Sequence, residues 1–289
     1  MRSKIQAIIL DVDGVIIGEK IGFNSPDPHA EVLQAMREVS QSEIPIVLCT
    51  AKPAFAIGKI IENAGLRNFH IADGGGLVIN PLNKEILSKH LISKAVAKKV
   101  VSKLLSENIY TEVYTPSEYV IQKSQLSSIT KDHQQVLATQ ARAVDSLVEE
   151  IDSLEIIKIM PIAKNIEHKK IVDEILQKFS AEILISWGVH PVILPLQFGI
   201  VTAPGISKSV ATLEIAKNLK IKMENVLGVG DSVSDWQFIE PCGYGVAMGN
   251  AHQELKELVA SKKQNSFVAP SVDENGIIEA FRHFGLLEH

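Results

Sequence analysis

The chain has 289 residues, of which 46% are hydrophobic and 22% charged, and its formal net charge is -5. This length is enough for a full hydrophobic core, arranged as one large domain or as two moderate ones. The negative net charge leaves no basic field to hold a nucleic-acid backbone, so we expect no DNA or RNA partner. A phosphorylated small molecule would have to be bound by a few local cations.

Neither a membrane span nor a secretory leader is indicated. The start of the chain, MRSKIQAIIL, has the basic-then-apolar order of a leader, but Asp11 and Asp13 end the apolar region early. The later apolar run VILPLQFGIV is well short of the roughly 20 residues that a span needs. The two cysteines, Cys49 and Cys242, occur in unrelated contexts. These features predict a protein of the reducing cytoplasm.

Strand and helix signals alternate at both ends of the chain. Continuous apolar runs predict buried strands, and apolar residues at helical spacing predict helices. In chain order we predict a strand at 7–11, a helix at 28–40, a strand at 44–50, a helix at 53–65, a helix at 207–219, a strand at 225–231, a helix at 235–243, a strand at 244–249, a helix at 251–261, a strand at 266–269 and a helix at 276–285. This alternation predicts an α/β fold, a doubly wound parallel sheet with helices on both faces.

The middle of the chain has a different pattern. Its helical segments are longer and more charged, and its strand signals have polar neighbours. We predict helices at 93–107, 133–151 and 167–180, and strands at 110–115, 155–160, 182–186 and 191–196. Residues 81–197 are therefore predicted to form a separate α+β module, inserted into a parallel-sheet domain made of residues 1–80 and 198–289.

Two carboxylates follow the first predicted strand. Asp11 and Asp13 are two residues apart, so in an extended chain both point to one face at the strand's carboxyl end, where open α/β sheets bind ligands. They would repel each other unless a divalent cation joins them or one stays protonated, and both options suit an attack on a phosphoryl group. Gly14 lets the backbone turn sharply after the pair. The alternative is an acidic turn at a strand end, since Asp-x-Asp-Gly is short enough to recur by chance.

Three further segments carry polar groups at strand or helix ends. Thr50 ends the second strand and is either a phosphate-binding hydroxyl or an ordinary helix N-cap. Lys208 lies in the first turn of a predicted helix, where a cation is unfavourable unless an anion is held there; otherwise it is a surface lysine. Asp231 and Asp235 follow the strand at 225–231, and on a helix they would face the same side, one as a metal ligand and one supporting it. A plain helix cap would explain one of these acids but not both.

These segments, in this order, resemble the four motifs of the haloacid dehalogenase superfamily of hydrolases. The matching stretches are DVDGV, CT, GISK and GVGDSVSD. The place of the inserted module between the second and third motifs, with the later GVAMGNA and DENGIIEAF, is similar to the Cof-like (type IIB) branch with a C2-type cap. The resemblance implies a Rossmann-like catalytic core with an inserted α+β cap domain.

The resemblance also implies a role for each matching residue. Asp11 would be the nucleophile that takes the phosphoryl group as an aspartyl phosphate, and Asp13 would protonate the leaving alcohol and then activate water. Mg²⁺ would be bound by Asp11, the backbone carbonyl of Asp13 and Asp231. The other implied positions are Thr50, Ala51 and Lys208 at the phosphoryl group, and Ser234 and Asp235 beside the metal.

Three positions depart from the family's pattern. Ala51 and Lys52 follow Thr50 where the family often has Gly-Arg, which puts a substrate contact of that arginine in doubt, although Lys52 keeps a positive charge. Ser234 stands where Asn is common, and Asp73 stands where relatives usually carry an amide. None of these changes removes a primary catalytic group.

Substrate selection is expected to come from the inserted module. Trp187, His190 and Lys164, at expected loop tips, are candidates for substrate contacts together with Lys52. The structural alternatives are a core tryptophan and a histidine that touches no ligand.

The function implied by the resemblance is that of a Mg²⁺-dependent phosphomonoesterase acting on a small phosphorylated metabolite such as a sugar phosphate. One alternative is a sugar phosphomutase, and another is a non-catalytic binding protein with the same fold. The intact Asp11, Asp13, Lys208 and Asp231 weigh against the binding protein. The sequence leaves the substrate and the oligomeric state open.

Overall fold

The computed structural model describes residues 4–189 and 193–288. The chain divides into two compact units, of which the first comprises Met1–Thr50, Ile57–Leu87 and Ser207–His289 and the second Ala51–Ala56 and Ser88–Ile206. The divisions after Leu87 and Ile206 lie several residues later than the predicted boundaries of the inserted module. The first boundary is later because strand β5 (Glu85–Lys89) still belongs to a sheet whose other strands lie in the first unit. The second is later because strand β11 (Gln197–Thr202) belongs to the sheet of the second unit.

A five-stranded parallel sheet forms the centre of the first unit, which confirms the predicted fold class. The strand order is β14-β13-β12-β1-β2, and every pair is parallel. The strands are β1 (Ala7–Leu10), β2 (Ile46–Leu48), β12 (Val226–Gly230), β13 (Tyr244–Ala247) and β14 (Ser266–Val268). In the register of the sheet, Leu10 lies beside Val229 on one side and Leu48 on the other. Residues that follow these strands therefore leave the sheet at one common edge.

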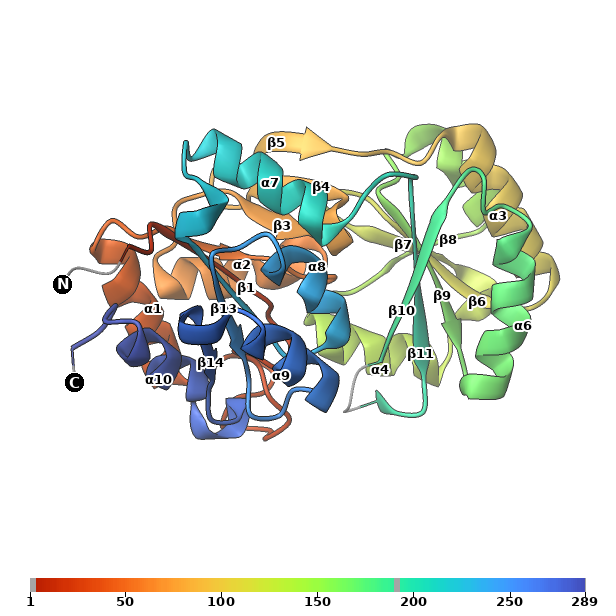
Figure 1. Ribbon diagram of the computed structural model, residues 1–289. Coiled ribbons are helices and arrows are strands. Elements are labelled where there is room, and N and C mark those ends of the chain that lie inside the picture. Colours follow the sequence, from red (N-terminus) through yellow and green to blue (C-terminus); the bar gives the residue numbers. More distant parts are fainter. Residues whose placement is uncertain (1–3, 190–192, 289) are drawn as a thin grey trace. The chain divides into compact units, whose positions relative to one another are not determined.

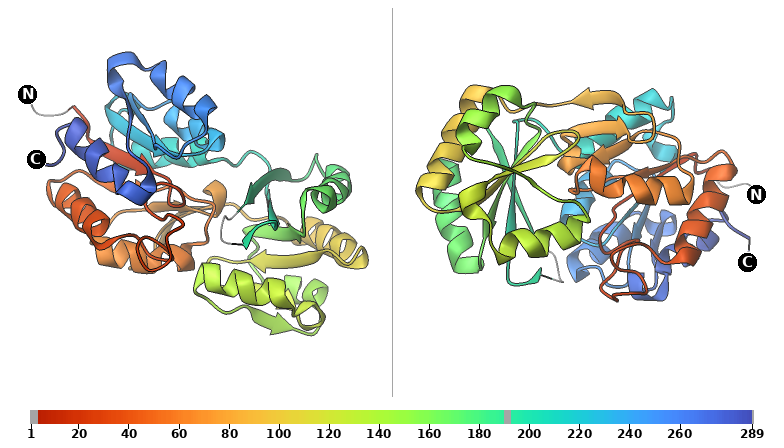
Figure 2. Two further views of the ribbon diagram at one scale, coloured as in Figure 1. Left: turned by 90° about the horizontal axis from the view of Figure 1, so that it is seen from below. Right: turned by 180° about the vertical axis from the view of Figure 1, so that it is seen from behind.

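Helices cover both faces of this sheet, as Figure 2 shows. On one face, Ile9 and Val47 pack against a buried cluster that includes Ala211, Phe238 and Leu255 of three helices. The helices are α1 (Ala30–Gln41), α2 (Ala54–Ala64), α7 (Lys208–Asn218), α8 (Trp236–Ile239), α9 (Gln253–Ala260) and α10 (Gly276–His283). Strands β3 (His70–Ala72) and β4 (Leu77–Asn80) form a smaller sheet with β5.

The second unit is built on a six-stranded mixed sheet in the order β10-β11-β9-β6-β7-β8 (Figure 1). Its strands besides β11 are β6 (Tyr110–Tyr114), β7 (Tyr119–Gln122), β8 (Arg142–Val144), β9 (Lys158–Ala163) and β10 (Leu184–Val189). Helices α3 (Lys94–Ser106), α5 (Leu147–Glu150) and α6 (Ile166–Gln177) share one aliphatic core with the sheet. Helix α4 (Ser128–Leu137) packs instead on the aromatic cluster around Tyr114, Tyr119 and Phe198.

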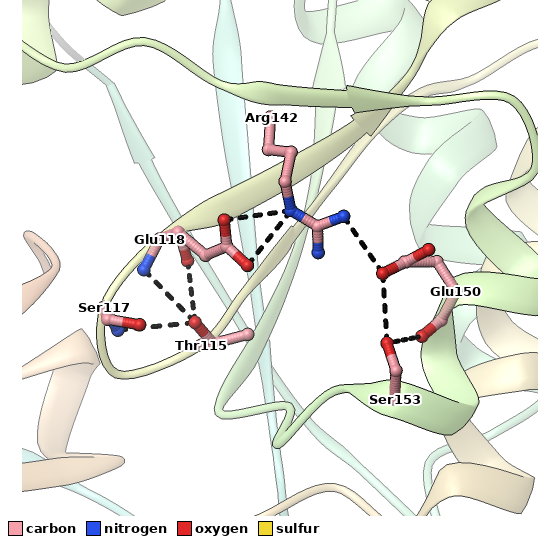
Figure 3. Close-up of polar contacts among 6 residues, drawn as sticks. All are labelled: Thr115, Ser117, Glu118, Arg142, Glu150 and Ser153. Carbon is pink, nitrogen blue, oxygen red and sulfur yellow. Dashed lines mark hydrogen bonds and ion pairs between the residues drawn. The ribbon is translucent and has the colours of Figure 1, made fainter.

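The single helix predicted at 133–151 is wrong. Helix α4 ends at Leu137, and Ala138 takes a left-handed conformation with φ 48°. The chain then forms β8, which pairs in parallel with β7. Arg142 of β8 donates from Nε to both carboxylate oxygens of Glu118 at 3.1 and 3.0 Å, and from Nη1 to Glu150 at 3.0 Å (Figure 3). Strand pairing and this ion-pair network therefore override the helical spacing of the apolar residues.

The strand predicted at 191–196 is not found in the part of it that the structure describes. Residues 191 and 192 lie outside the described residues, and Leu196 donates its N–H to the Ile193 carbonyl at 3.1 Å in a turn. Strand β11 begins only at Gln197. Throughout residues 4–189 and 193–288, every helix is too short or too polar to cross a membrane.

Candidate active site

Acidic side chains gather at the carboxyl edge of the parallel sheet. Asp11 directly follows β1, and Asp231 directly follows β12. One carboxylate oxygen each of Asp11, Asp231 and Asp235 can be chosen so that all lie within 4.8 Å of one another. Residues so far apart in the sequence meet because β1 and β12 are parallel neighbours that end together, with Leu10 beside Val229.

Lys208 lies among these carboxylates. It is the first residue of α7, whose N-cap Ser207 accepts a hydrogen bond from the Val210 N–H through its hydroxyl. The ammonium of Lys208 contacts Asp11 Oδ1 at 2.8 Å and Asp235 Oδ1 at 2.7 Å, and only 13% of the lysine side chain is exposed. The sequence predicted an anion beside this cation at the start of a helix, and the anions found here are two carboxylates.

The fully buried Asp235 shapes the turn that follows β12. While Oδ1 binds Lys208, Oδ2 accepts hydrogen bonds from the backbone N–H groups of Asp231 at 3.2 Å and Ser232 at 3.0 Å. A Cβ at Gly230 would lie 2.5 Å from the Cβ of Asp235, so the turn requires glycine there. Residues Val233–Asp235 form a 3-10 turn, so a tight turn brings the two acids together where the sequence suggested a helix.

Gly14 makes room for the Asp231 side chain. Its φ is +76°, which confirms the predicted sharp turn after the aspartate pair. A Cβ built on Gly14 would lie 2.0 Å from Asp231 Oδ2, so the carboxylate packs directly against the glycine. Asn250 donates to the Gly14 carbonyl at 2.9 Å and, more weakly, to Asp231 Oδ2 at 3.4 Å. Sequence reasoning missed Asn250, although it follows β13 at the same sheet edge as the aspartates, and that position was the available signal.

The charges of the cluster shift the pKa values of its members. Burial raises the pKa of the Asp11 carboxyl well above its usual range, although Lys208 acts in the opposite sense. Burial, with the neighbouring charges of Asp235 and Asp13, raises the pKa of Asp231 to about 7. Burial opposes the charge of Lys208, but Asp11 and Asp235 outweigh it and hold the pKa of the ammonium well above its usual value.

The donor set fits a divalent cation. If the carboxylates of Asp11, Asp231 and Asp235 are ionised, the cluster that they form with the Lys208 ammonium has a net charge of two negative units. Carboxylate oxygens are the ligands that Mg²⁺ prefers. A bound dication would therefore balance the charge of the cluster and favour the ionised form of Asp231.

The other residues predicted in this unit lie around the cluster. Thr50 is buried and follows β2; its N–H donates to the Ile71 carbonyl at 3.0 Å, and α2 begins only at Ala54, so Thr50 does not cap that helix. Asp13 is half-buried and is not one of the three grouped carboxylates. The Ser234 hydroxyl shares a hydrogen bond with Ser232 at 2.7 Å.

The remaining predicted site residues belong to the second unit. The Ala51 carbonyl accepts a hydrogen bond from Lys158 Nζ at 3.0 Å, and Lys52 is half-buried. Trp187 on β10 is half-buried, packs against the aliphatic core of the unit and donates its indole N–H to Asp173 of α6 at 2.6 Å. His190 lies outside the described residues. A substrate contact by Trp187, His190, Lys164 or Lys52 stays a prediction.

Comparison with known proteins gives matches along nearly the whole chain. A family model of haloacid dehalogenase-like hydrolases matches residues 8–281. The 5-amino-6-(5-phospho-D-ribitylamino)uracil phosphatase YwtE of Bacillus subtilis is 25% identical over 94% of this chain and 95% of its own length. The phosphoglycolate phosphatase of Methanothermobacter thermautotrophicus is 23% identical over 96% of this chain and 98% of its own.

Solved structures share the fold. A haloacid dehalogenase-like hydrolase from Bacteroides thetaiotaomicron superposes with a TM-score of 0.83 at 20% identity, covering 96% of this chain and 98% of that one. A subclass IIB sugar phosphatase of the haloacid dehalogenase superfamily superposes with a TM-score of 0.77 at 22% identity, covering 98% of this chain and 100% of that one.

Proposed function

Because the chain belongs to the family of haloacid dehalogenase-like hydrolases, we propose that it is a Mg²⁺-dependent phosphomonoesterase that works through an aspartyl phosphate on Asp11. One observation carries most of this proposal. Asp11, which follows β1, is ion-paired with Lys208 and shares a carboxylate cluster with Asp231. A nucleophile, a cation for phosphoryl oxygens and a metal-binding carboxylate are the groups that phosphoryl transfer to an enzyme carboxylate requires.

In the first half of the proposed reaction, a carboxylate oxygen of Asp11 attacks phosphorus. The bond from phosphorus to the substrate's ester oxygen breaks, and Asp13 gives its proton to the departing alcohol. Lys208, which now neutralises Asp11, also faces the charge of the phosphoryl oxygens when substrate is present.

In the second half, Asp13 takes a proton from water while the water oxygen attacks phosphorus. The acyl phosphate bond breaks, inorganic phosphate leaves and the Asp11 carboxylate is restored. When bound, Mg²⁺ supplies positive charge that lowers the repulsion between Asp11 and the phosphoryl oxygens, and Asp11, Asp231 and the Asp13 carbonyl would hold it. The half-buried position of Asp13, directly after Asp11 and Val12, suits its exchange of protons with substrate and water.

We infer that the substrate is a small phosphorylated metabolite such as a sugar phosphate and that the second unit serves as the cap that selects it. Support comes from the matched proteins, which include a phosphoglycolate phosphatase and, among solved structures, a sugar phosphatase. Their names differ in substrate, so they support the class of compound and no single member of it.

The test is release of inorganic phosphate from a panel of sugar phosphates, phosphoglycolate and an aryl phosphate, with Mg²⁺ and with excess chelator. We expect phosphate release that needs Mg²⁺. Formation of an isomeric sugar phosphate without free phosphate would show a mutase instead. No release from any compound would contradict the proposed function.

A further inference from the structure

Asn250 links three separate segments at the carboxyl edge of the parallel sheet. It lies in the turn after β13, inside the GVAMGNA stretch. Its side-chain nitrogen donates to the Gly14 carbonyl at 2.9 Å and to Asp231 Oδ2 at 3.4 Å. Its side-chain oxygen accepts from the Val272 N–H at 2.9 Å. An exposed asparagine on a turn would ordinarily bond to water, so three protein partners from distant segments call for an explanation.

The backbone on either side of Asn250 is also fixed against the turn that carries Asp231. The Met248 N–H donates to the Gly230 carbonyl at 3.0 Å, and the His252 N–H donates to the Asp231 carbonyl at 3.2 Å. The same turn is also held against the segment around Pro270. The Gly249 N–H donates to the Pro270 carbonyl at 3.1 Å, and a Cβ at Gly249 would lie 2.6 Å from the Ser271 nitrogen. Asn250 is thus presented to Asp231 by a turn with little freedom to move.

The chemistry of the partners requires an amide at this position. The Val272 N–H can only donate, so it fixes the asparagine oxygen toward itself. The nitrogen must then face the Gly14 carbonyl and Asp231 Oδ2, which can only accept while Asp231 is ionised. An aspartate at position 250 would set acceptor against acceptor, and an aliphatic residue would leave all three partners without this bond.

We propose that Asn250 is a positioning residue for metal binding, which holds Asp231 Oδ2 against Gly14 so that the other carboxylate oxygen is free to bind the cation. The same amide ties the Gly14 carbonyl, and therefore the loop that carries Asp11 and Asp13, to the turn that carries Asp231. Asn250 acts through Asp231 and the loop. The inference rests on the proposed Mg²⁺ dependence. Groups that orient metal ligands in this way typically contribute about 10- to 100-fold to metal affinity.

The test is the dissociation constant of Mg²⁺, measured by isothermal titration calorimetry on the full chain without substrate. Asn250→Ala is compared with Asn265→Ala, which removes a similar bond from a side-chain amide to a glycine carbonyl, that of Gly243 at 3.1 Å. We expect Asn250→Ala to weaken Mg²⁺ binding about tenfold or more, and Asn265→Ala to leave it within twofold of wild type. Thermal unfolding in chelator reports the purely structural cost of each change.

Asn250→Ser is the second variant. Its side chain stays polar but is too short to reach both Val272 and Gly14, and it replaces Asn250→Ala in the measurement if the alanine variant does not fold. Weakening of Mg²⁺ binding by less than fivefold in a folded variant would overturn the inference. The Mg²⁺ affinities of wild type and of Asp231→Asn are measured first. If wild type binds no Mg²⁺, or if Asp231→Asn binds it as tightly as wild type does, the proposed metal site fails. If the metal site holds and Asn250→Ala binds Mg²⁺ like wild type, only the role of Asn250 fails.

Discussion

Gly14→Ala tests whether the space beside Asp231 is needed for metal binding. The added Cβ would lie 2.0 Å from Asp231 Oδ2 and 2.3 Å from its Cγ. To reach an ordinary contact of 3.4 Å from 2.0 Å, the carboxylate must move by about 1.4 Å, which is enough to break its contact with Asn250. In addition, alanine at a φ of +76° costs roughly 1–2 kcal/mol of stability.

Gly285→Ala is the matched control, because Gly285 has a φ of +65° and an added Cβ there would have no contact within 4 Å among residues 4–189 and 193–288. In chelator, we expect both variants to unfold at a lower temperature, by about 2–4 °C for each 1 kcal/mol lost. On Mg²⁺ titration, we expect Gly14→Ala to show a dissociation constant raised about tenfold or more and Gly285→Ala to show the wild-type value. Equal Mg²⁺ affinity in the two variants would refute the reasoning that Gly14 determines where the Asp231 carboxylate lies.

Two further predictions concern residues away from the carboxylate cluster. His70 is buried and accepts the Leu48 N–H at 3.1 Å, and burial lowers its pKa to about 3, so the stability that its neutral form contributes is present above pH 6.5 and is lost as the pH falls toward 3. Wild type should lose about 2 kcal/mol of folding stability from this source between pH 7 and pH 5. In His70→Asn, which keeps a hydrogen-bond acceptor but does not titrate in this range, the melting temperature should fall less between pH 7 and pH 5 than in wild type. An equal fall of the melting temperature in the two proteins would contradict this. Trp187→Phe, which loses the bond to Asp173, should cost about 1 kcal/mol in thermal unfolding. If Trp187 also contacts the substrate, as the sequence predicts, kcat/KM should fall roughly tenfold, or by 1.4 kcal/mol, and an unchanged kcat/KM would contradict that contact.

Much of the site's framework could be predicted because it follows from strand ends. The apolar runs before Asp11 and Asp231 mark buried parallel strands, and side chains at the carboxyl ends of such strands meet at one edge of the sheet. Gly14 was predictable for a similar reason, since a glycine after two carboxylates indicates a sharp turn. The place of Lys208 beside anions was predictable because a lysine in the first turn of a helix is unfavourable unless an anion lies next to it.

The rest depended on tertiary contacts that leave no periodic signal. Residues 133–151 have helical spacing, but the pairing of β8 with β7 and the bonds of Arg142 decide their conformation. The buried Glu112 is stabilised by His133 of α4 at 2.9 Å, a pairing that neither residue's neighbours in the sequence reveal. Asn250 was likewise missed because its three partners come from three separate segments.

The assignment of Asp11 as the nucleophile is tested most directly by comparing Asp11→Asn with wild type in the hydrolysis of an aryl phosphate with Mg²⁺. Asp27→Asn, at an exposed carboxylate paired with Lys59, is the control for removal of one negative charge. With circular dichroism showing an intact fold, we expect Asp11→Asn to lose turnover by on the order of 10³-fold or more and Asp27→Asn to retain it. Hydrolysis by Asp11→Asn at the wild-type rate would contradict the account.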